Sequence, residues 1–85
     1  MELKDTVNLM CSDDYKERFK AEYYQTKVRY EKLKSFNNRI MAADMARMPM
    51  PEHTCPEHLL RDQQRIMGEY LGLLELRAVI ENIEL

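Results

Sequence analysis

Residues 56–85 read PEHLLRDQQRIMGEYLGLLELRAVIENIEL, and no proline follows Pro56 in this stretch. Proline suits the first turn of a helix, and the residues behind it have a helical apolar period. At about 100° per residue, one broad face collects Leu59, Leu60, Ile66, Met67, Tyr70, Leu71, Leu73, Leu74 and Ala78. We therefore predict one long helix over about residues 56–84, on whose core face the rest of the chain packs.

The opposite side of this predicted helix changes character along its length. It begins charged and then presents Gly68, Gly72, Leu76, Val79 and Ile83. Glycine costs about 1 kcal/mol relative to alanine inside a helix, so two glycines aligned with three aliphatic residues indicate a closely packed second partner. We predict that these five residues form an interface between copies of the chain. The alternative is that the glycines tolerate solvent and the aliphatic residues cover an N-terminal segment.

A second long helix is predicted over about residues 13–44. Ser12-Asp13-Asp14 is a typical helix start, and neither glycine nor proline follows for about thirty residues. The apolar residues recur at near-heptad spacing, which favours a coiled-coil-like hairpin. They are Tyr15, Phe19, Tyr23, Tyr30, Leu33, Ile40 and Met41.

The remaining segments complete a single domain over residues 1–85. Residues 2–10 are amphipathic at helical spacing and predict a short helix across the hairpin, and residues 45–55 form a link containing Pro49 and Pro51. The predicted fold is all-α: an antiparallel hairpin of two long helices with a short N-terminal helix, assembled into an oligomeric bundle. A chain of 85 residues buries only about 60% of its unfolded surface, and oligomerisation is a common remedy.

Composition excludes several classes of function. The formal charge is −2, so non-specific nucleic-acid binding is not expected. No apolar run reaches the roughly 20 residues of a membrane span, and Met1-Glu2-Leu3-Lys4-Asp5 lacks the apolar core of a secretory signal. Cys11 and Cys55 then read as free thiols of a cytoplasmic protein.

Polar residues interrupt both apolar stripes. In an antiparallel hairpin, Asn37 falls near Gln63 and Glu22 falls near Arg77. One interpretation is that polar pairs fix the alignment of the helices; the other is that they line a polar pocket.

Catalytic signatures are missing. His53, Cys55 and His58 with Cys11 have the ligand types of a zinc site, but no CxxC pair is present and Cys11 lies far away in sequence. There is no glycine-rich phosphate loop, and no orienting acid can be argued for a Cys–His pair. We therefore expect no enzyme activity, no metal and no cofactor.

Tyrosine and arginine are the better candidates for ligand contacts. Tyrosine rings stack on bases and arginine binds phosphate, especially at an oligomer seam. The candidate ligand-binding residues are Tyr23, Tyr24, Arg29, Arg61 and Arg65. The alternative is a helical core surrounded by solvated charges.

Several strings, such as Asp14-Tyr15-Lys16-Glu17-Arg18-Phe19 and Cys55-Pro56-Glu57-His58-Leu59-Leu60, resemble a family of small helical proteins of gut phages and Firmicutes prophages related to a crAss-like phage protein. The resemblance covers nearly the whole chain and implies a viral accessory protein in the bacterial cytoplasm. It brings no catalytic residues.

The function that we expect rests on this resemblance and on an analogy of size and helicity. Small phage accessory proteins are often counter-defence factors, and some short helical ones form oligomers that sequester cyclic nucleotide signals. We expect the chain to sequester a nucleotide immune signal. The alternatives are a protein-interaction inhibitor of a host defence protein and a phage structural or assembly factor.

Overall fold

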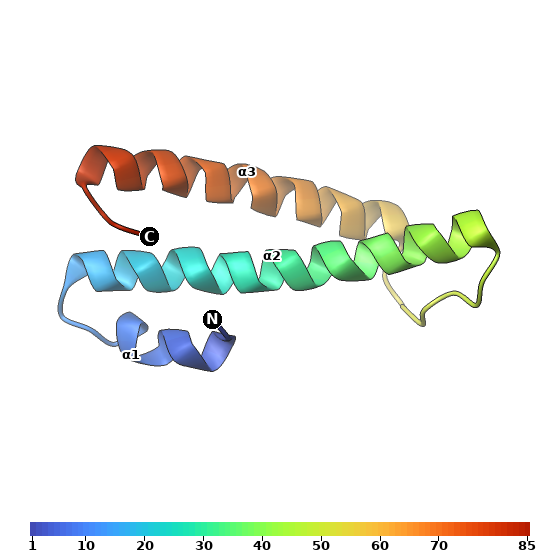
Figure 1. Cartoon of the computed structure of the whole chain (residues 1–85), viewed down its shortest axis with the longest axis horizontal. Coiled ribbons are helices and arrows are strands. Elements are labelled where there is room, and N and C mark those ends of the chain that lie inside the picture. The colour runs from blue at the N-terminus through green and yellow to red at the C-terminus, as the bar shows by residue number, and fades with distance from the viewer.

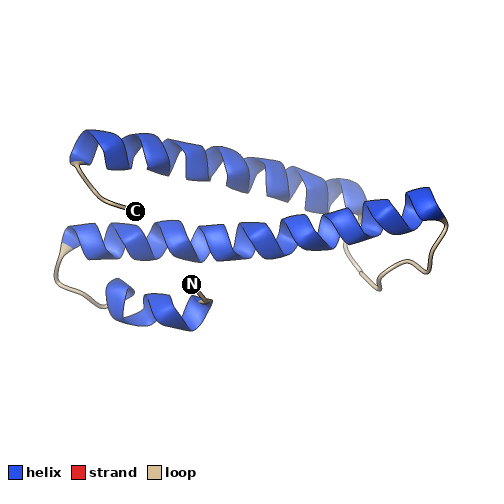
Figure 2. Cartoon of the chain, in the orientation of Figure 1, coloured by secondary structure: helices blue, strands red, loops and turns tan.

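The computed structural model describes residues 1–85, and every element in it is helical (Figure 2). The elements are a 3₁₀ turn η1 (Leu3–Thr6), α1 (Val7–Met10), α2 (Tyr15–Ala46) and α3 (Glu57–Glu81). α2 lies in the middle, with α3 antiparallel along one side and the η1–α1 segment along the other (Figure 1). The prediction of an all-helical hairpin with a short N-terminal helical segment is confirmed.

The two long helices begin and end where local chemistry dictates. Asp14 caps α2 by accepting a hydrogen bond from the Lys16 N–H at 3.0 Å. α2 ends at Arg47, which has a left-handed backbone with φ of 55° and precedes the link containing the two prolines. α3 starts after Pro56 and ends at Asn82, which is left-handed with φ of 56°. Because asparagine tolerates this conformation better than most residues, it serves as a helix stop.

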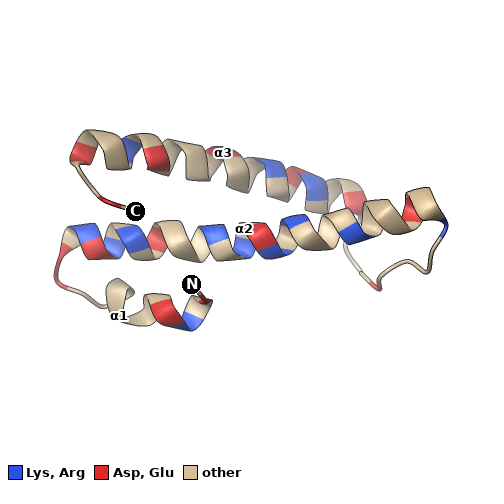
Figure 3. Ribbon diagram, viewed as in Figure 1, with Lys and Arg blue, Asp and Glu red and all other residues tan.

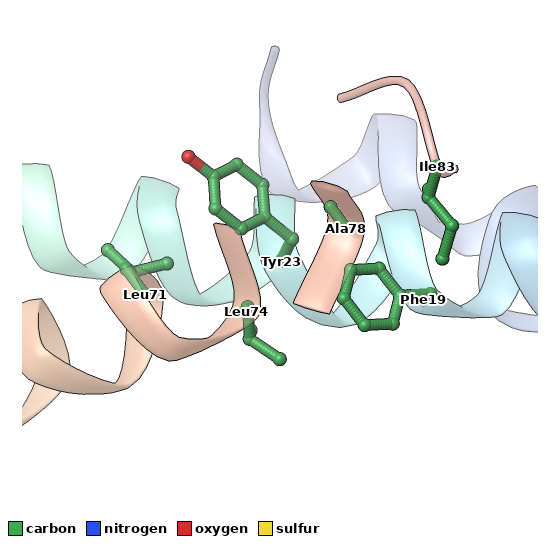
Figure 4. Close-up of a cluster of buried hydrophobic side chains, with 6 residues drawn as sticks. All are labelled: Phe19, Tyr23, Leu71, Leu74, Ala78 and Ile83. Atoms are coloured by element: carbon green, nitrogen blue, oxygen red, sulfur yellow. The ribbon is translucent and has the colours of Figure 1, made fainter. Parts of the chain in front are cut away.

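The end of α3 corrects the predicted helix, which ran to about residue 84. After Asn82, the Ile83 N–H donates to the Ala78 carbonyl at 2.8 Å, so the chain turns back on itself. Ile83 thereby leaves the helical periodicity and enters the core. The six core residues lie between α2, α3 and this returning tail (Figure 4): Phe19, Tyr23, Leu71, Leu74, Ala78 and Ile83.

The core is smaller than the apolar pattern predicts. Only 11 of the 85 residues are buried, and Leu59, Ile66, Tyr70 and Leu73 of the predicted core face are exposed. Tyr15 and Met41 of the predicted α2 stripe are exposed as well. The physical reason is that α3 has a single neighbour, α2, which covers only one side of its circumference.

Polar contacts set the alignment of α2 and α3. The Tyr15 and Tyr23 hydroxyls donate to Glu81 at 2.8 Å and to Glu75 at 2.6 Å, and the Tyr70 hydroxyl donates back to Glu22. Nearer the link, the buried Asn37 donates to Gln64 Oε1 at 2.8 Å and to the Leu60 carbonyl at 3.2 Å.

These contacts decide between the two interpretations of the polar interruptions. Asn37 pairs with Gln64, the neighbour of the predicted Gln63. Glu22 lies near Arg77 as predicted, in one shared hollow, but its hydrogen bond comes from the Tyr70 hydroxyl. The bonds run directly from one helix to the other. Since sliding α3 by one turn breaks all of them, these polar residues fix the register of the hairpin.

The N-terminal segment is fastened to α2 through a polar contact. Thr6 is fully buried; its hydroxyl donates to the Leu3 carbonyl at 2.7 Å and accepts from Gln25 Nε2 at 3.2 Å. This contact holds the start of the chain beside the middle of α2, where the candidate site lies.

Candidate functional site: a basic cavity on α2

Positive charge is concentrated on α2. This helix carries eight of the thirteen Lys and Arg residues of the chain, against four Asp and Glu residues, whereas α3 carries more acids than bases. Figure 3 shows the basic residues spread along α2. An anionic ligand is therefore attracted to α2 rather than to α3.

A cavity of about 350 Å³ lies where the start of the chain meets this basic helix. It is lined by Met1, Tyr24, Lys27, Val28, Glu31 and Lys32, and we call it the Tyr24 cavity. Five of these residues lie on consecutive turns of one face of α2, at positions 24, 27, 28, 31 and 32. The cavity therefore combines an apolar, aromatic floor with two ammonium groups.

The two lysines of the Tyr24 cavity are free to meet a ligand. Neither Lys27 nor Lys32 belongs to any of the six ion pairs of the chain. The Lys27 ammonium lies 5.8 Å from the centre of the Tyr23 ring, which leaves its hydrogen-bond donors unengaged. Tyr23 in turn meets the Tyr24 ring edge-on, with ring centres 5.1 Å apart.

A second, smaller hollow adjoins the first across Lys27 and Glu31. This Tyr23 groove, of about 200 Å³, lies between α2 and α3 and also includes Tyr23, Tyr30, Gly68, Leu71, Gly72 and Glu75. Its charged residues are one lysine and two glutamates, and the Tyr23 hydroxyl already donates to Glu75. The Tyr23 groove is thus less suited to an anion than the Tyr24 cavity.

A third hollow, of about 240 Å³, contains Tyr15, Arg18, Phe19, Glu22 and Arg77. Its polar groups are already partnered within the chain. Arg77 bonds to Glu81 at 3.0 Å and to the Tyr15 hydroxyl at 2.7 Å, and Arg18 donates to the Ser12 carbonyl at 2.8 Å. A ligand would have to break these bonds, so this hollow is a weaker candidate.

The structure does not bring the five predicted ligand residues together. Tyr23 and Tyr24 are in contact, and each lines one of the two adjoining hollows. Arg29 is exposed and lines none of the cavities. Arg61 pairs with Glu57 at 3.7 Å, and Arg65 pairs with Glu69 at 3.2 Å, both on α3.

Sequence reasoning missed Lys27, Val28, Glu31 and Lys32. The sequence did contain evidence for these four residues, because their spacing from Tyr24 places all of them on one helical face. What the sequence did not reveal is that Met1 lies beside this face and lines a cavity with it.

The five predicted interface residues do not share one exposed face. A Cβ on Gly68 would lie 3.1 Å from the Tyr30 ring of the same chain, and Ile83 is buried in the chain's own core. These two placements correct the prediction, because Gly68 serves close packing of α3 on α2 and Ile83 lies beyond the helix end. Gly72 faces open space, and Leu76 and Val79 are exposed.

The cysteines and histidines form no joint cluster. Cys11 and Cys55 are both exposed, and no group of three metal-ligating side chains occurs in the chain. His53 packs edge-on against Phe36, and its Nε2 lies 3.9 Å from Glu57. No helix has both the length and the apolar character to cross a membrane.

Tyr23 makes the stability of the fold depend on pH in the alkaline range. Burial, followed by the hydrogen bond to Glu75, raises the pKa of Tyr23 to about 12, above the value of about 10 for an unfolded tyrosine. The folded state therefore favours the neutral phenol, and its contribution to stability is full below pH 10 and is lost between pH 10 and 12. Hydrogen bonds to Glu81 and Glu22 raise the pKa of Tyr15 and of Tyr70 in the same direction.

We expect the absorbance of tyrosinate at alkaline pH to rise late and together with the loss of helical circular dichroism. In Tyr23→Phe, the latest part of this absorbance change should be missing. A wild-type titration that is complete by about pH 10.5, with the helices intact, would contradict this assignment.

The fold and the Tyr24 cavity define a small helical-hairpin protein with an open, basic and aromatic hollow on its central helix. A family model described as Sequestin matches residues 13–80, which include all of α2 and all but the last residue of α3. The chain belongs to the Sequestin family. No curated protein and no solved structure matches it.

Proposed function

We propose that the protein sequesters a nucleotide immune signal without turning it over, and that the Tyr24 cavity holds the ligand. The observation that carries this proposal is a pair of lysines without carboxylate partners beside an aromatic and aliphatic floor. The family name Sequestin supports a sequestering role. The resemblance to phage proteins supports a counter-defence setting in the bacterial cytoplasm.

The apolar floor suits a base. Tyr24 and Val28 come from successive turns of α2, and Met1 lines the cavity with them. An aromatic ring that stacks on a base contributes about 1–3 kcal/mol to binding. The cavity volume of about 350 Å³ is within the range of small-molecule sites.

The lysines suit phosphate. Lys27 and Lys32 flank the floor, and hydrogen bonds between charged groups contribute about 1.5–3 kcal/mol each. Glu31, between them, can accept a hydrogen bond from a ribose hydroxyl or from an amino group of the base. A free carboxylate here also disfavours ligands with a high density of phosphate.

Calorimetric titration of the purified protein with cyclic dinucleotides, cyclic trinucleotides and cyclic ADP-ribose isomers tests the proposal. We expect one member of this panel to bind. For that ligand, the double variant Lys27→Ala/Lys32→Ala should bind at least about tenfold more weakly, and Tyr24→Ala should lose about 1–3 kcal/mol. The nucleotide released from the protein by denaturation after incubation should be chemically unchanged.

The matched control is Lys20→Ala/Lys34→Ala, which removes the same charge from the same helix outside the Tyr24 cavity. It should bind normally. The proposal fails if no panel member binds the wild type. If the control pair weakens binding as much as the cavity pair, the ligand contacts α2 elsewhere.

A second candidate function is inhibition of a host defence protein through a protein interface. The observation that favours it is a group of exposed methionines at the link end of the hairpin: Met41, Met45, Met48 and Met50. Methionine is adaptable and frequent on binding surfaces. A pull-down from host lysate that recovers one stoichiometric protein, lost in Met45→Glu/Met48→Glu, would favour this function; recovery of none would remove it.

A further inference from the structure

α3 exposes a continuous apolar stripe that the fold of one chain leaves uncovered. Leu59, Ile66, Leu73 and Ile80 follow one another at intervals of seven residues, and Leu76 lies beside them. Their exposed fractions run from 52% at Leu59 to 78% at Ile80. We call these five residues the α3 stripe.

The α3 stripe faces away from α2. The buried residues Leu71, Leu74 and Ala78 mark the side of α3 that meets α2, and the stripe lies about 120° around the helix from them. The η1–α1 segment packs only against α2, on the far side of the molecule (Figure 1). No helical element other than α2 therefore packs against α3.

The chain exposes more surface than a compact monomer of its mass. One chain exposes 6329 Å², whereas a compact monomer of 10.2 kDa exposes about 5,300 Å². The excess of about 1,000 Å² is close to the roughly 800 Å² that each partner buries in a stable protein interface. The chain therefore exposes enough additional surface for an interface with a second copy.

The spacing of the stripe is self-complementary. About an axis between Glu69 and Tyr70, reversal of the helix brings Leu59 opposite Ile80 and Ile66 opposite Leu73. In the resulting pair of helices, each of these four residues of one copy faces a residue of the other copy, and every such pair joins a leucine to an isoleucine. An antiparallel arrangement also opposes the two helix dipoles, and a heptad stripe suits helices that cross at about 20°.

We propose that the α3 stripe is the interface of an antiparallel homodimer, with α3 packed on its own copy about a two-fold axis between Glu69 and Tyr70. This surface shares only Leu76 with the glycine face that the sequence indicated, namely Gly68, Gly72, Leu76, Val79 and Ile83. It also leaves the Tyr24 cavity open, because no residue that lines that cavity belongs to α3. The dimer does not depend on the proposed nucleotide function.

Light scattering coupled to size exclusion tests the dimer. We expect the wild type at twice the 10.2 kDa of one chain, and Ile66→Glu/Leu73→Glu at the mass of one chain with its helical circular dichroism retained. Val79→Glu is the control, because Val79 is 77% exposed but lies off the stripe. It should remain dimeric.

Cross-linking tests the direction, in a Cys11→Ser/Cys55→Ser background. Leu59→Cys alone should form no inter-chain disulfide, because in the antiparallel dimer the two copies of residue 59 are about 30 Å apart. Leu59→Cys/Ile80→Cys should form one readily. Disulfide formation by Leu59→Cys alone would overturn the antiparallel arrangement.

A wild-type mass of one chain at about 100 μM would overturn the interface, as would a dimer that survives Ile66→Glu/Leu73→Glu. Dissociation by Val79→Glu alone would also overturn it, in favour of the glycine face. Nucleotide binding is measured separately on the same samples. A monomer that still binds a nucleotide would leave the proposed function intact, and a dimer that binds none would leave this interface intact.

Discussion

Leu74→Ala is expected to lower the free energy of unfolding by about 2–5 kcal/mol, the cost of truncating a fully buried leucine. Leu74 is 1% exposed and belongs to the six-residue core (Figure 4). A domain of this length has a total stability of about 4–13 kcal/mol. The substitution therefore removes a large share of it, and urea denaturation followed by circular dichroism at fixed protein concentration measures the loss.

Leu74→Met is the matched control for this prediction. It keeps the volume of the side chain and should cost less than about 1.5 kcal/mol. Equal losses from alanine and methionine would mean that the position tolerates no change of shape. A loss below about 1 kcal/mol from Leu74→Ala would contradict the assignment of Leu74 to the core.

Ile83→Ala is expected to have the second-largest effect, also about 2–4 kcal/mol. The side chain is only 6% exposed and joins the core after the chain reverses at Asn82. Its loss unpacks the returning tail from the six-residue core, and it removes the apolar contact that accompanies the bond from the Ile83 N–H to the Ala78 carbonyl. Urea denaturation measures this loss, and light scattering measures the mass.

Val79→Ala separates a core role from an interface role for Ile83. Both residues were predicted to lie at the oligomer seam, but Val79 is exposed whereas Ile83 is buried. We expect Val79→Ala to change stability by less than about 0.5 kcal/mol. If Ile83→Ala instead left the stability of the chain intact and only halved the mass, Ile83 would be an interface residue after all.

The two long helices and the link were predictable because their signals are local. Asp14 and Pro56 mark helix starts, and the prolines of residues 49–51 exclude helix there. The end of α3 was missed by about three residues, because Asn82 is a weaker stop signal than glycine. The candidate site was predictable only in part: Tyr23 and Tyr24 lie at it, whereas the three predicted arginines lie elsewhere.

Local and long-range determinants can be separated for the whole protein. Composition, caps and apolar period determined by themselves that the chain is an all-helical hairpin, since each depends on neighbours within a few residues. Tertiary structure alone decided which apolar residues are buried, because one partner helix covers only one side of α3 and leaves Leu59, Ile66, Leu73 and Ile80 outside. It also decided that Met1 helps to line the Tyr24 cavity, because that placement brings together residues far apart in sequence.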